Sequence, residues 1–176
     1  MVSGDGESAA ERLCAACGMC CNGVLFDGTR LEPEDSVRSL AALGLRLKRQ
    51  DGELQFLQPC PAYKGSCCSI YGKRPQRCRT FACRQLRALD AGERSEEEVR
   101  AKVAEAKKRT DHVRDLFQKL GDTRVNRTLA KRYATVFTPP LDPSPEALQL
   151  RNELEQAMIA LQAMLAADFR TEASEG

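Results

Sequence analysis

The chain has 176 residues, which fits one domain or one domain with an appendage. It has 27 lysines and arginines against 25 aspartates and glutamates, and a net charge of +2 does not indicate a nucleic-acid-binding protein. Only 5% of the residues are aromatic and none is tryptophan, so a large aromatic core is excluded and the cysteine-rich half needs another source of stability.

In the N-terminal half, short elements are expected between the cysteines. Residues 1–12 form a polar, flexible lead that can become helical just before Cys14, and residues 24–26 form a strand. The run from residue 32 to 37 starts a helix, with Pro33 in its first turn, that ends near Gly44. Residues 54–57 form another strand. A short helix begins near Pro75, and a further helix spans residues 84–91.

The C-terminal half predicts three helices. Ser95 and Glu98 form a capping box, and an apolar stripe then repeats every three or four residues as far as residue 120. A shorter helix is expected at residues 126–137. Ser144 and Pro145 open a last helix, and residues 170–176 form a frayed tail. The two long stripes predict an antiparallel hairpin within one chain, or alternatively the seam of a homodimer.

The expected fold class is mainly α. A small, irregular, cysteine-rich and metal-stapled N-terminal region has a few short strands, and the long C-terminal helices form a hairpin or bundle. The chain accordingly divides into a flexible lead (1–12), a metal-binding domain (13–92), a helical extension (93–169) and a tail (170–176).

Nine cysteines are the unusual feature of the composition, and all of them lie between Cys14 and Cys83. Such a set indicates metal binding or disulfides, and the compartment decides between them. The N-terminus lacks a basic stretch followed by an apolar one, and no run approaches 18 apolar residues. We therefore expect a cytoplasmic protein without a membrane segment, whose reduced thiols bind metal. Disulfides are the less favoured alternative.

The first cysteine cluster is Cys14, Cys17, Cys20 and Cys21. A gap of two residues lets a tight turn aim two sulfurs at one ion, and this gap occurs twice in succession. Neighbouring side chains of an extended chain point to opposite sides. The adjacent Cys20 and Cys21 are therefore expected to serve different metals, unless one of them bridges two.

The second cluster contains Cys60, Cys67, Cys68, Cys78 and Cys83. On an unbroken helix, the five-residue step from Cys78 to Cys83 is a net rotation of about 140°, so either the helix bends or the two bind different ions. Cations interleave with these cysteines, which favours charge compensation of thiolates over a nucleic-acid patch. The cations are Lys64, Lys73, Arg74, Arg77, Arg79, Arg84 and Arg87, against the single acid Asp90.

These motifs resemble a known family, the YkgJ-type cysteine-cluster proteins or CxxCxxCC zinc- or iron-chelating domain. The matching strings are Cys14-Ala-Ala-Cys17-Gly-Met-Cys20-Cys21, Cys60-Pro61, Cys68-Ser-Ile-Tyr71 and Arg74-Pro75-Gln-Arg-Cys78-Arg79-Thr-Phe81-Ala-Cys83. The resemblance covers roughly residues 14–90. It implies eight metal ligands: Cys14, Cys17, Cys20, Cys21, Cys60, Cys68, Cys78 and Cys83. Cys67 is extra to the pattern.

Two kinds of metal centre fit the spacing. Eight thiolates can form two closed zinc sites, which would bind about two ions. The run from Cys14 to Cys20 followed by Cys60-Pro61 also partly matches an iron–sulfur ligand pattern. Tyr71 is either a donor to a thiolate or a packed aromatic residue.

The expected function is zinc or iron chelation by a structural or chelating domain. The C-terminal helices would serve as a platform for a protein partner or a homodimer. The alternative is an iron–sulfur redox protein or enzyme component that acts on a partner protein. No catalytic motif is recognised, and His112, the only histidine, is expected at the surface of a helix. We therefore expect a binding protein more than an enzyme.

Overall fold

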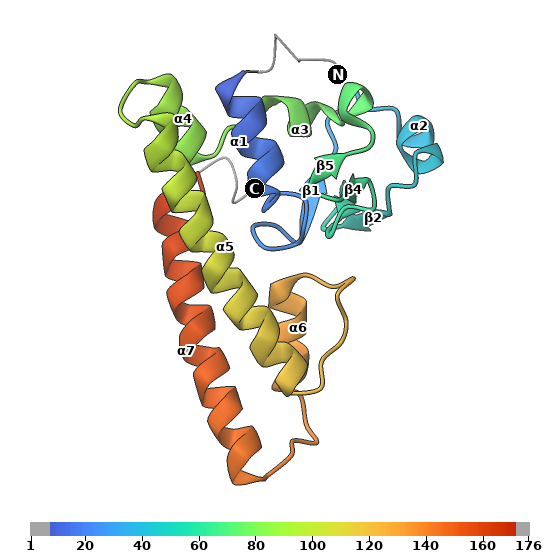
Figure 1. Cartoon of the computed structure of the whole chain (residues 1–176). Helices are drawn as coiled ribbons and strands as arrows, with labels where there is room; N and C mark the ends of the chain where they lie inside the picture. The colour runs from blue at the N-terminus through green and yellow to red at the C-terminus, as the bar shows by residue number, and fades with distance from the viewer. Residues whose placement is uncertain (1–7, 172–176) are drawn as a thin grey trace.

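The structure is a computed structural model, and it describes residues 8–171. Figure 1 shows a cysteine-rich region of short helices and strands beside the upper part of two long helices, which project well beyond it. The mainly helical fold and the split between an irregular N-terminal region and long C-terminal helices are confirmed. No helix within the described residues is long and apolar enough to cross a membrane.

The N-terminal half contains short elements joined by turns. Its first helix begins after Ser8, whose hydroxyl accepts a hydrogen bond from the Glu11 N–H while the Glu11 carboxylate accepts one from the Ser8 N–H. The elements are α1 (Ala9–Cys17), β1 (Gly28–Arg30), α2 (Val37–Ala42), β2 (Leu47–Gln50), β3 (Glu53–Leu57), β4 (Tyr63–Lys64), β5 (Cys67–Cys68), the 3-10 helix η1 (Tyr71–Lys73) and α3 (Gln76–Thr80).

Strands β1, β3 and β2 form a three-stranded antiparallel sheet in that spatial order, and β4 pairs with β5 in a short hairpin. The strand expected at residues 54–57 is confirmed as β3. The strand expected at residues 24–26 is wrong, because Val24 and Leu25 are buried in a turn closed by the Leu25 N–H on the Met19 carbonyl (3.1 Å). The first sheet strand instead begins at Gly28.

The helix expected to start between residues 32 and 37 begins late in that run. Asp35 accepts a hydrogen bond from the Glu32 N–H (2.9 Å), so the acids form a turn before the helix. Ser36 then caps α2, and its hydroxyl accepts from the Ser39 N–H (3.3 Å). Pro33 therefore lies in the turn rather than in the first helical turn.

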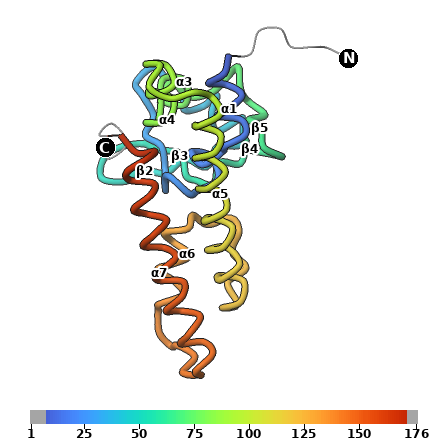
Figure 2. Tube along the Cα trace, turned by 60° about the vertical axis from the view of Figure 1, so that its left-hand side comes forward, coloured from blue at the N-terminus to red at the C-terminus, as the bar shows by residue number. Residues whose placement is uncertain are grey.

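The C-terminal half contains α4 (Arg84–Asp90), α5 (Glu96–Lys119), α6 (Leu129–Val136) and α7 (Pro145–Asp168). The capping box of Ser95 and Glu98 is confirmed, as are Ser144 and Pro145 at the start of α7. Helix α6 begins at Leu129, later than expected, because Thr128 is its N-cap. Helices α5 and α7 pack as an antiparallel hairpin with α6 beside it (Figures 1 and 2), so the apolar stripes meet within one chain.

Two hydrophobic clusters stabilise the molecule, and they differ in size. The larger one runs along the hairpin and includes Phe117, Leu154 and Leu161, which are almost completely buried. The smaller one lies in the cysteine-rich region and contains only five buried residues, of which Phe56 is the one aromatic. The cysteine-rich region also contributes Leu13, Met19, Val24, Leu25 and Leu86 to the larger cluster, so the expected thin core describes only the part beside the sheet.

The chain ends of the described part are packed. Helix α1 already begins at Ala9, inside the lead expected at residues 1–12, and residues 1–7 of that lead lie outside the described residues. Of the tail expected at residues 170–176, Arg170 donates to the Gln162 side chain (2.8 Å) and Thr171 is buried. Residues 172–176 lie outside the described part.

Candidate metal centre

All nine cysteines lie within the described residues, and each carries a free thiol. Two of them are on the last turns of α1, two follow in the next turn of the chain, and one lies in the loop after β3. The others are on β5, on α3 and directly before α4. In chain order these positions are Cys14, Cys17, Cys20, Cys21, Cys60, Cys67, Cys68, Cys78 and Cys83.

Helix α1 presents Cys14 and Cys17 on one face, since residues three apart are neighbours on a helix surface. Gly18 ends the helix in the left-handed conformation, with φ of 64°, and its N–H donates to the Cys14 carbonyl (3.0 Å). The chain then turns, and the Cys21 N–H donates to the Gly18 carbonyl (2.9 Å). This reversal brings Cys20 and Cys21 back toward the end of α1.

Gly18 is also required by a close approach of Tyr63. A Cβ atom at position 18 would lie 1.9 Å from the Tyr63 hydroxyl oxygen and 2.4 Å from its Cζ. Burial raises the pKa of Tyr63, and the nearby Cys21 and Cys17 raise it further. The phenol of Tyr63 therefore packs on the glycine between two of the cysteines of the first cluster.

A backbone hydrogen bond connects the two clusters, since the Cys60 N–H donates to the Cys21 carbonyl (2.7 Å). The Cys60 carbonyl accepts from the Tyr63 N–H (3.0 Å), and Tyr63 pairs with Cys68 across the β4–β5 hairpin. Residues almost 50 positions apart are thus held close together by main-chain contacts.

Helix α3 presents Cys78, and its start is fixed from outside the helix. Pro75 is the N-cap and offers no side-chain acceptor, but the Asp35 carboxylate accepts from the Gln76 N–H (2.8 Å). The helix ends at Thr80, and the chain is extended at Phe81 before α4 begins after Cys83. The helix is therefore broken between Cys78 and Cys83, and whether the two bind one ion or separate ions does not follow from this break alone.

Burial makes most of these thiols poor acids. It raises the pKa of Cys14 to about 11 and that of Cys17, Cys21 and Cys78 to about 12. Cys14 is exposed as a whole residue, yet surrounding atoms still desolvate its sulfur. A bound cation would reverse the preference, because metal ligation requires the thiolate.

The last cysteine of the set has an additional feature. Burial raises the pKa of Cys83, and the N–H groups of Leu86 and Gln85 partly offset this at the start of α4. A thiolate at this position would accept hydrogen bonds from the helix backbone, which favours the charged form.

Basic residues approach the thiols from several elements. Arg74 lowers the pKa of both Cys14 and Cys78, although burial remains the main influence on each. Arg87 acts in the same way on Cys83. Of the seven cations that the sequence predicts to compensate thiolate charge, Arg74 and Arg87 therefore act on cysteines in this way.

Two other cations near the thiols were missed from the sequence, because they lie outside the cysteine motifs. Arg46 precedes β2 and lowers the pKa of Cys60, and Lys107 of α5 lowers that of Cys17, each against the larger effect of burial. Lys107 also donates to the Ala16 carbonyl (3.1 Å). Only the fold could show that these side chains reach the cysteines.

The donor set fits a thiophilic metal. Cysteine thiols from α1, the following turn, the loop after β3, β5, α3 and the start of α4 come together beside basic side chains, and soft thiolates select zinc, copper(I) or iron–sulfur centres. Within residues 8–171, no group of three or more Cys, His, Asp or Glu side chains is arranged so that it could hold one metal ion. The ligands implied by the resemblance are therefore brought into one region without forming a coordination shell.

Cys67 differs from the other cysteines. It is exposed at the end of the β4–β5 hairpin, and its thiol donates to the Lys64 carbonyl (3.1 Å). This position agrees with its being extra to the ligand pattern.

Two other residues that the sequence singled out contact acidic side chains rather than thiols. Tyr71 is 43% exposed, its hydroxyl donates to Glu11 (2.8 Å), and the Arg74 guanidinium stacks on its ring at 3.5 Å. Both interpretations of Tyr71, as a thiolate donor or as a packed aromatic residue, are therefore wrong. His112 is exposed on α5 beside Glu153 (3.5 Å), as expected.

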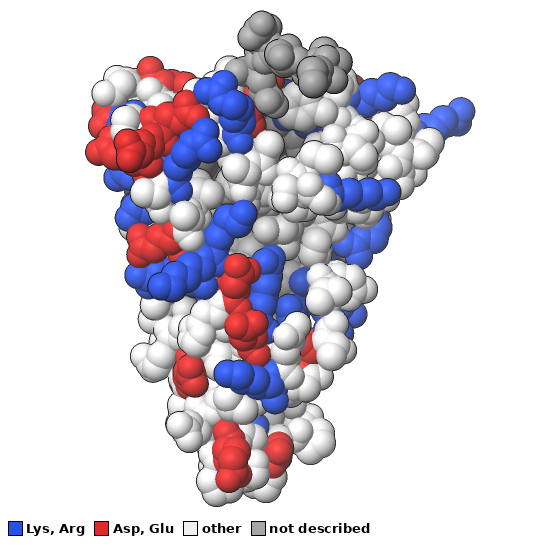
Figure 3. Space-filling model, viewed as in Figure 1, with Lys and Arg blue, Asp and Glu red and all other residues white. Residues whose placement is uncertain are grey.

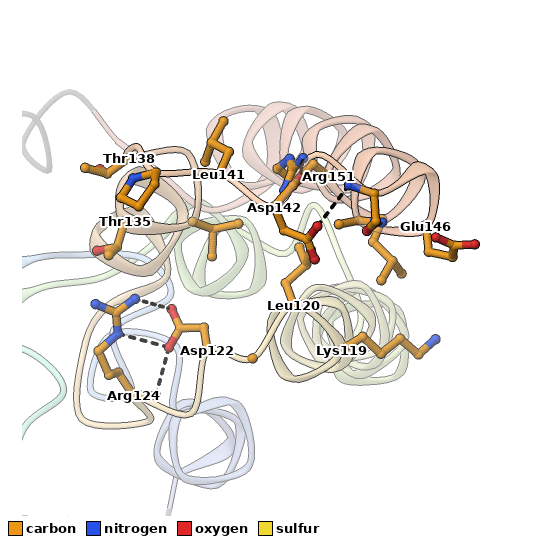
Figure 4. A pocket seen from close by; sticks show the side chains of 16 residues that line it. Lys119, Leu120, Asp122, Arg124, Thr135, Thr138, Leu141, Asp142, Glu146 and Arg151 are labelled. Atoms are coloured by element: carbon orange, nitrogen blue, oxygen red, sulfur yellow. Dashed lines mark hydrogen bonds and ion pairs between the residues drawn. The ribbon is translucent and has the colours of Figure 1, made fainter.

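A hollow of about 450 Å³ lies at the far end of the hairpin, between the end of α5, α6 and the start of α7 (Figure 4). Its arginines already have partners: Arg124 binds the Asp122 carboxylate (3.1 Å), and Arg151 donates to the Asp142 carbonyl. On the face seen in Figure 3, Lys and Arg side chains are scattered among acidic and uncharged ones rather than forming one continuous basic patch.

Comparison with known proteins supports the metal centre. No curated protein and no solved structure matches the chain. A family model matches residues 13–112, more than half of the chain, and it is described as the CxxCxxCC putative zinc- or iron-chelating domain. The match includes all nine cysteines and the first part of α5. The chain therefore belongs to the CxxCxxCC family of zinc- or iron-chelating domains.

Proposed function

We propose that the cysteines bind zinc as a structural element that holds the N-terminal region together. The observation that carries this proposal is the contrast between many converging thiols and a smaller cluster of only five buried apolar residues. Structural zinc contributes on the order of 10 kcal/mol in small zinc domains, about as much as the burial of these five side chains together. The sheet and the short helices around the thiols would then depend on the metal.

Purification without oxygen, followed by elemental analysis and a visible spectrum, tests the proposal. The expected protein is colourless, contains about two zinc ions per chain, and loses amide protection at β1, β2 and β3 when a strong chelator is added. The α5–α7 hairpin is the internal control, because its stability comes from apolar packing and its protection should persist. A protein that keeps its sheet protected after complete metal removal would contradict a structural role.

An iron–sulfur centre is the second candidate, and the burial of the thiols favours it. Groups of cysteine thiolates are also the usual ligands of these clusters, and burial and nearby cations tune the cluster potential. The protein would then be a redox protein or an enzyme component that acts on a partner protein. Brown colour, acid-labile sulfide and an EPR signal after reduction would establish this candidate and exclude the zinc proposal.

The proposal includes the helical extension as a platform for a second copy of the chain. Leu148 and Ile159 are 50% and 57% exposed, and they lie on one uncharged line of α7 that has Glu153 and Glu155 on either side of it. An uncharged helix face of this kind is self-complementary, so two copies related by a twofold axis can pair through it.

A further inference from the structure

We propose that the eight cysteines divide into two separate four-thiolate sites, which deepens the proposed function and rests on it. Site A contains Cys14, Cys17, Cys20 and Cys83. Site B contains Cys21, Cys60, Cys68 and Cys78. The boundary between the sites falls at the peptide bond between Cys20 and Cys21, and Cys67 belongs to neither.

The two hydrophobic clusters give the first argument. Cys17, Cys20 and Cys83 pack against the larger cluster along the hairpin. Cys60 and Cys78 pack against the smaller cluster beside the sheet. No cysteine is shared between the clusters among the described residues. The thiols are therefore already sorted by the part of the fold that supports them.

Main-chain contacts define site A. Cys14 and Cys17 share a face of α1, and the turn at Gly18 brings Cys20 back to the same end of the helix. Helices α1 and α4 both pack on the first part of α5. Cys83 immediately precedes α4, so α5 holds it on the side of α1.

Main-chain contacts also define site B. The hydrogen bond from the Cys60 N–H to the Cys21 carbonyl joins these two residues directly. The β4–β5 hairpin returns the chain so that Cys68 lies opposite Tyr63, which is itself bonded to the Cys60 carbonyl. Cys78 completes the site from α3, the helix anchored by Asp35.

Each site would then have four thiolates around one ion, which is the closed arrangement of structural zinc. With a divalent ion, each site has a net charge of about −2. Lys107 and Arg87 approach site A, Arg46 approaches site B, and Arg74 approaches both. The alternative is a single multinuclear cluster in which one or more thiolates bridge the metals.

Pairs of substitutions in the full chain distinguish these arrangements, with Zn²⁺ as the probe and zinc content as the measurement. Cys17→Ser combined with Cys20→Ser removes two ligands of one site, so the content should fall from two ions per chain to one. Cys20→Ser combined with Cys21→Ser removes one ligand from each site, so it should fall to zero. Cys67→Ser is the matched control and should retain two ions.

An equal loss of zinc in the two double variants would overturn the division of the cysteines into two sites. A wild-type protein without bound metal would overturn both the proposed function and this division. If the wild type contains iron, the same variants are compared by iron content and the same pattern is expected. Far-UV circular dichroism identifies variants in which the α5–α7 hairpin is lost, and these are excluded from the comparison.

A measurement on the wild type removes any dependence on the folding of variants. The protein is loaded with ¹¹³Cd²⁺, which replaces Zn²⁺ at thiolates and gives NMR couplings to the cysteine Hβ protons. The Hβ protons of Cys20 should couple to one cadmium resonance and those of Cys21 to the other. A cysteine that couples to both resonances would show a bridging thiolate and refute two separate sites.

Discussion

Replacement of Gly18 by alanine tests the packing that holds the two cysteine clusters together. The added Cβ would overlap the Tyr63 hydroxyl oxygen at 1.9 Å and Cζ at 2.4 Å, distances that no relaxed contact allows. The backbone at this position also has φ of 64°, which is unfavourable for any residue with a Cβ. The Tyr63 ring, which belongs to the strand paired with Cys68, would have to move off Gly18.

The expected loss of stability has two parts. The left-handed backbone costs an alanine about 1–2 kcal/mol. The forced movement of a packed aromatic ring costs a further ~1–3 kcal/mol. Gly65→Ala is the matched control, since its φ of 53° brings a similar backbone cost but a Cβ there would meet nothing within 4 Å. The difference between the two variants therefore isolates the clash with Tyr63.

Urea unfolding of both variants at one fixed concentration of free Zn²⁺ gives the two free energies, because bound ligand shifts the apparent stability. Gly18→Ala should be less stable than Gly65→Ala by about 1–3 kcal/mol. Adding Tyr63→Ala to Gly18→Ala should recover that difference in a double-mutant cycle. Equal stabilities of the two glycine variants, or no coupling to Tyr63, would refute the proposed packing.

Three further predictions concern the helical extension. Asp122→Ala should lower the free energy of unfolding by about 3 kcal/mol, because it leaves the buried Arg132 without its carboxylate partner, whereas Asp111→Ala at an exposed pair should cost less than about 1 kcal/mol. Burial alone would raise the pKa of Asp122, but hydrogen bonds and charge from Arg124 and Arg132 lower it overall. The stabilisation by the Asp122 carboxylate should therefore be present at neutral pH and disappear as the pH falls below about 4. Acid titrations of the free energy of unfolding should show this loss in the wild type and not in Asp122→Ala. Ile159→Lys should abolish self-association measured by light scattering without changing the circular dichroism, and a wild-type protein that stays monomeric at high concentration would contradict pairing through α7.

The long helices could be predicted from the sequence because their signals are local. Ser95 with Glu98, and Ser144 with Pro145, mark helix starts by hydrogen bonds within one turn. The stripe that ends at residue 120 predicts the buried face of α5 in the same local way. The strand expected at residues 24–26 is wrong because apolar residues in a short run can equally be buried in a turn, and only the tertiary fold decides this.

The candidate site was predicted in part. The resemblance implied eight ligand cysteines and left Cys67 out, and this set stays a prediction; Cys67 lies exposed with its thiol on the Lys64 carbonyl. Arg46 and Lys107 were missed, since each reaches the thiols from an element without a cysteine. The role of Tyr63 was missed for the same reason: no local pattern indicates that its ring packs on Gly18, 45 positions earlier in the chain.

The first part of α5 packs on the cysteine-rich region: Arg12 binds Glu96 (3.1 Å) and Lys107 binds the Ala16 carbonyl (3.1 Å). The family match ends at residue 112, within this helix. Beyond this residue α5 also contacts α6, as where Phe117 lies under the Arg132 guanidinium.

The larger hydrophobic cluster continues this connection, because it contains Leu13 and Met19 from the cysteine-rich region together with Val103 and Ala106 of α5. Site A of our proposal lies against this cluster through Cys17, Cys20 and Cys83, whereas site B lies against the smaller one. Metal at site A would therefore fix the cysteine-rich region to the hairpin, and metal at site B would stabilise the sheet. Since Cys20 and Cys21 are adjacent, the order imposed by one ion would also restrict the other site.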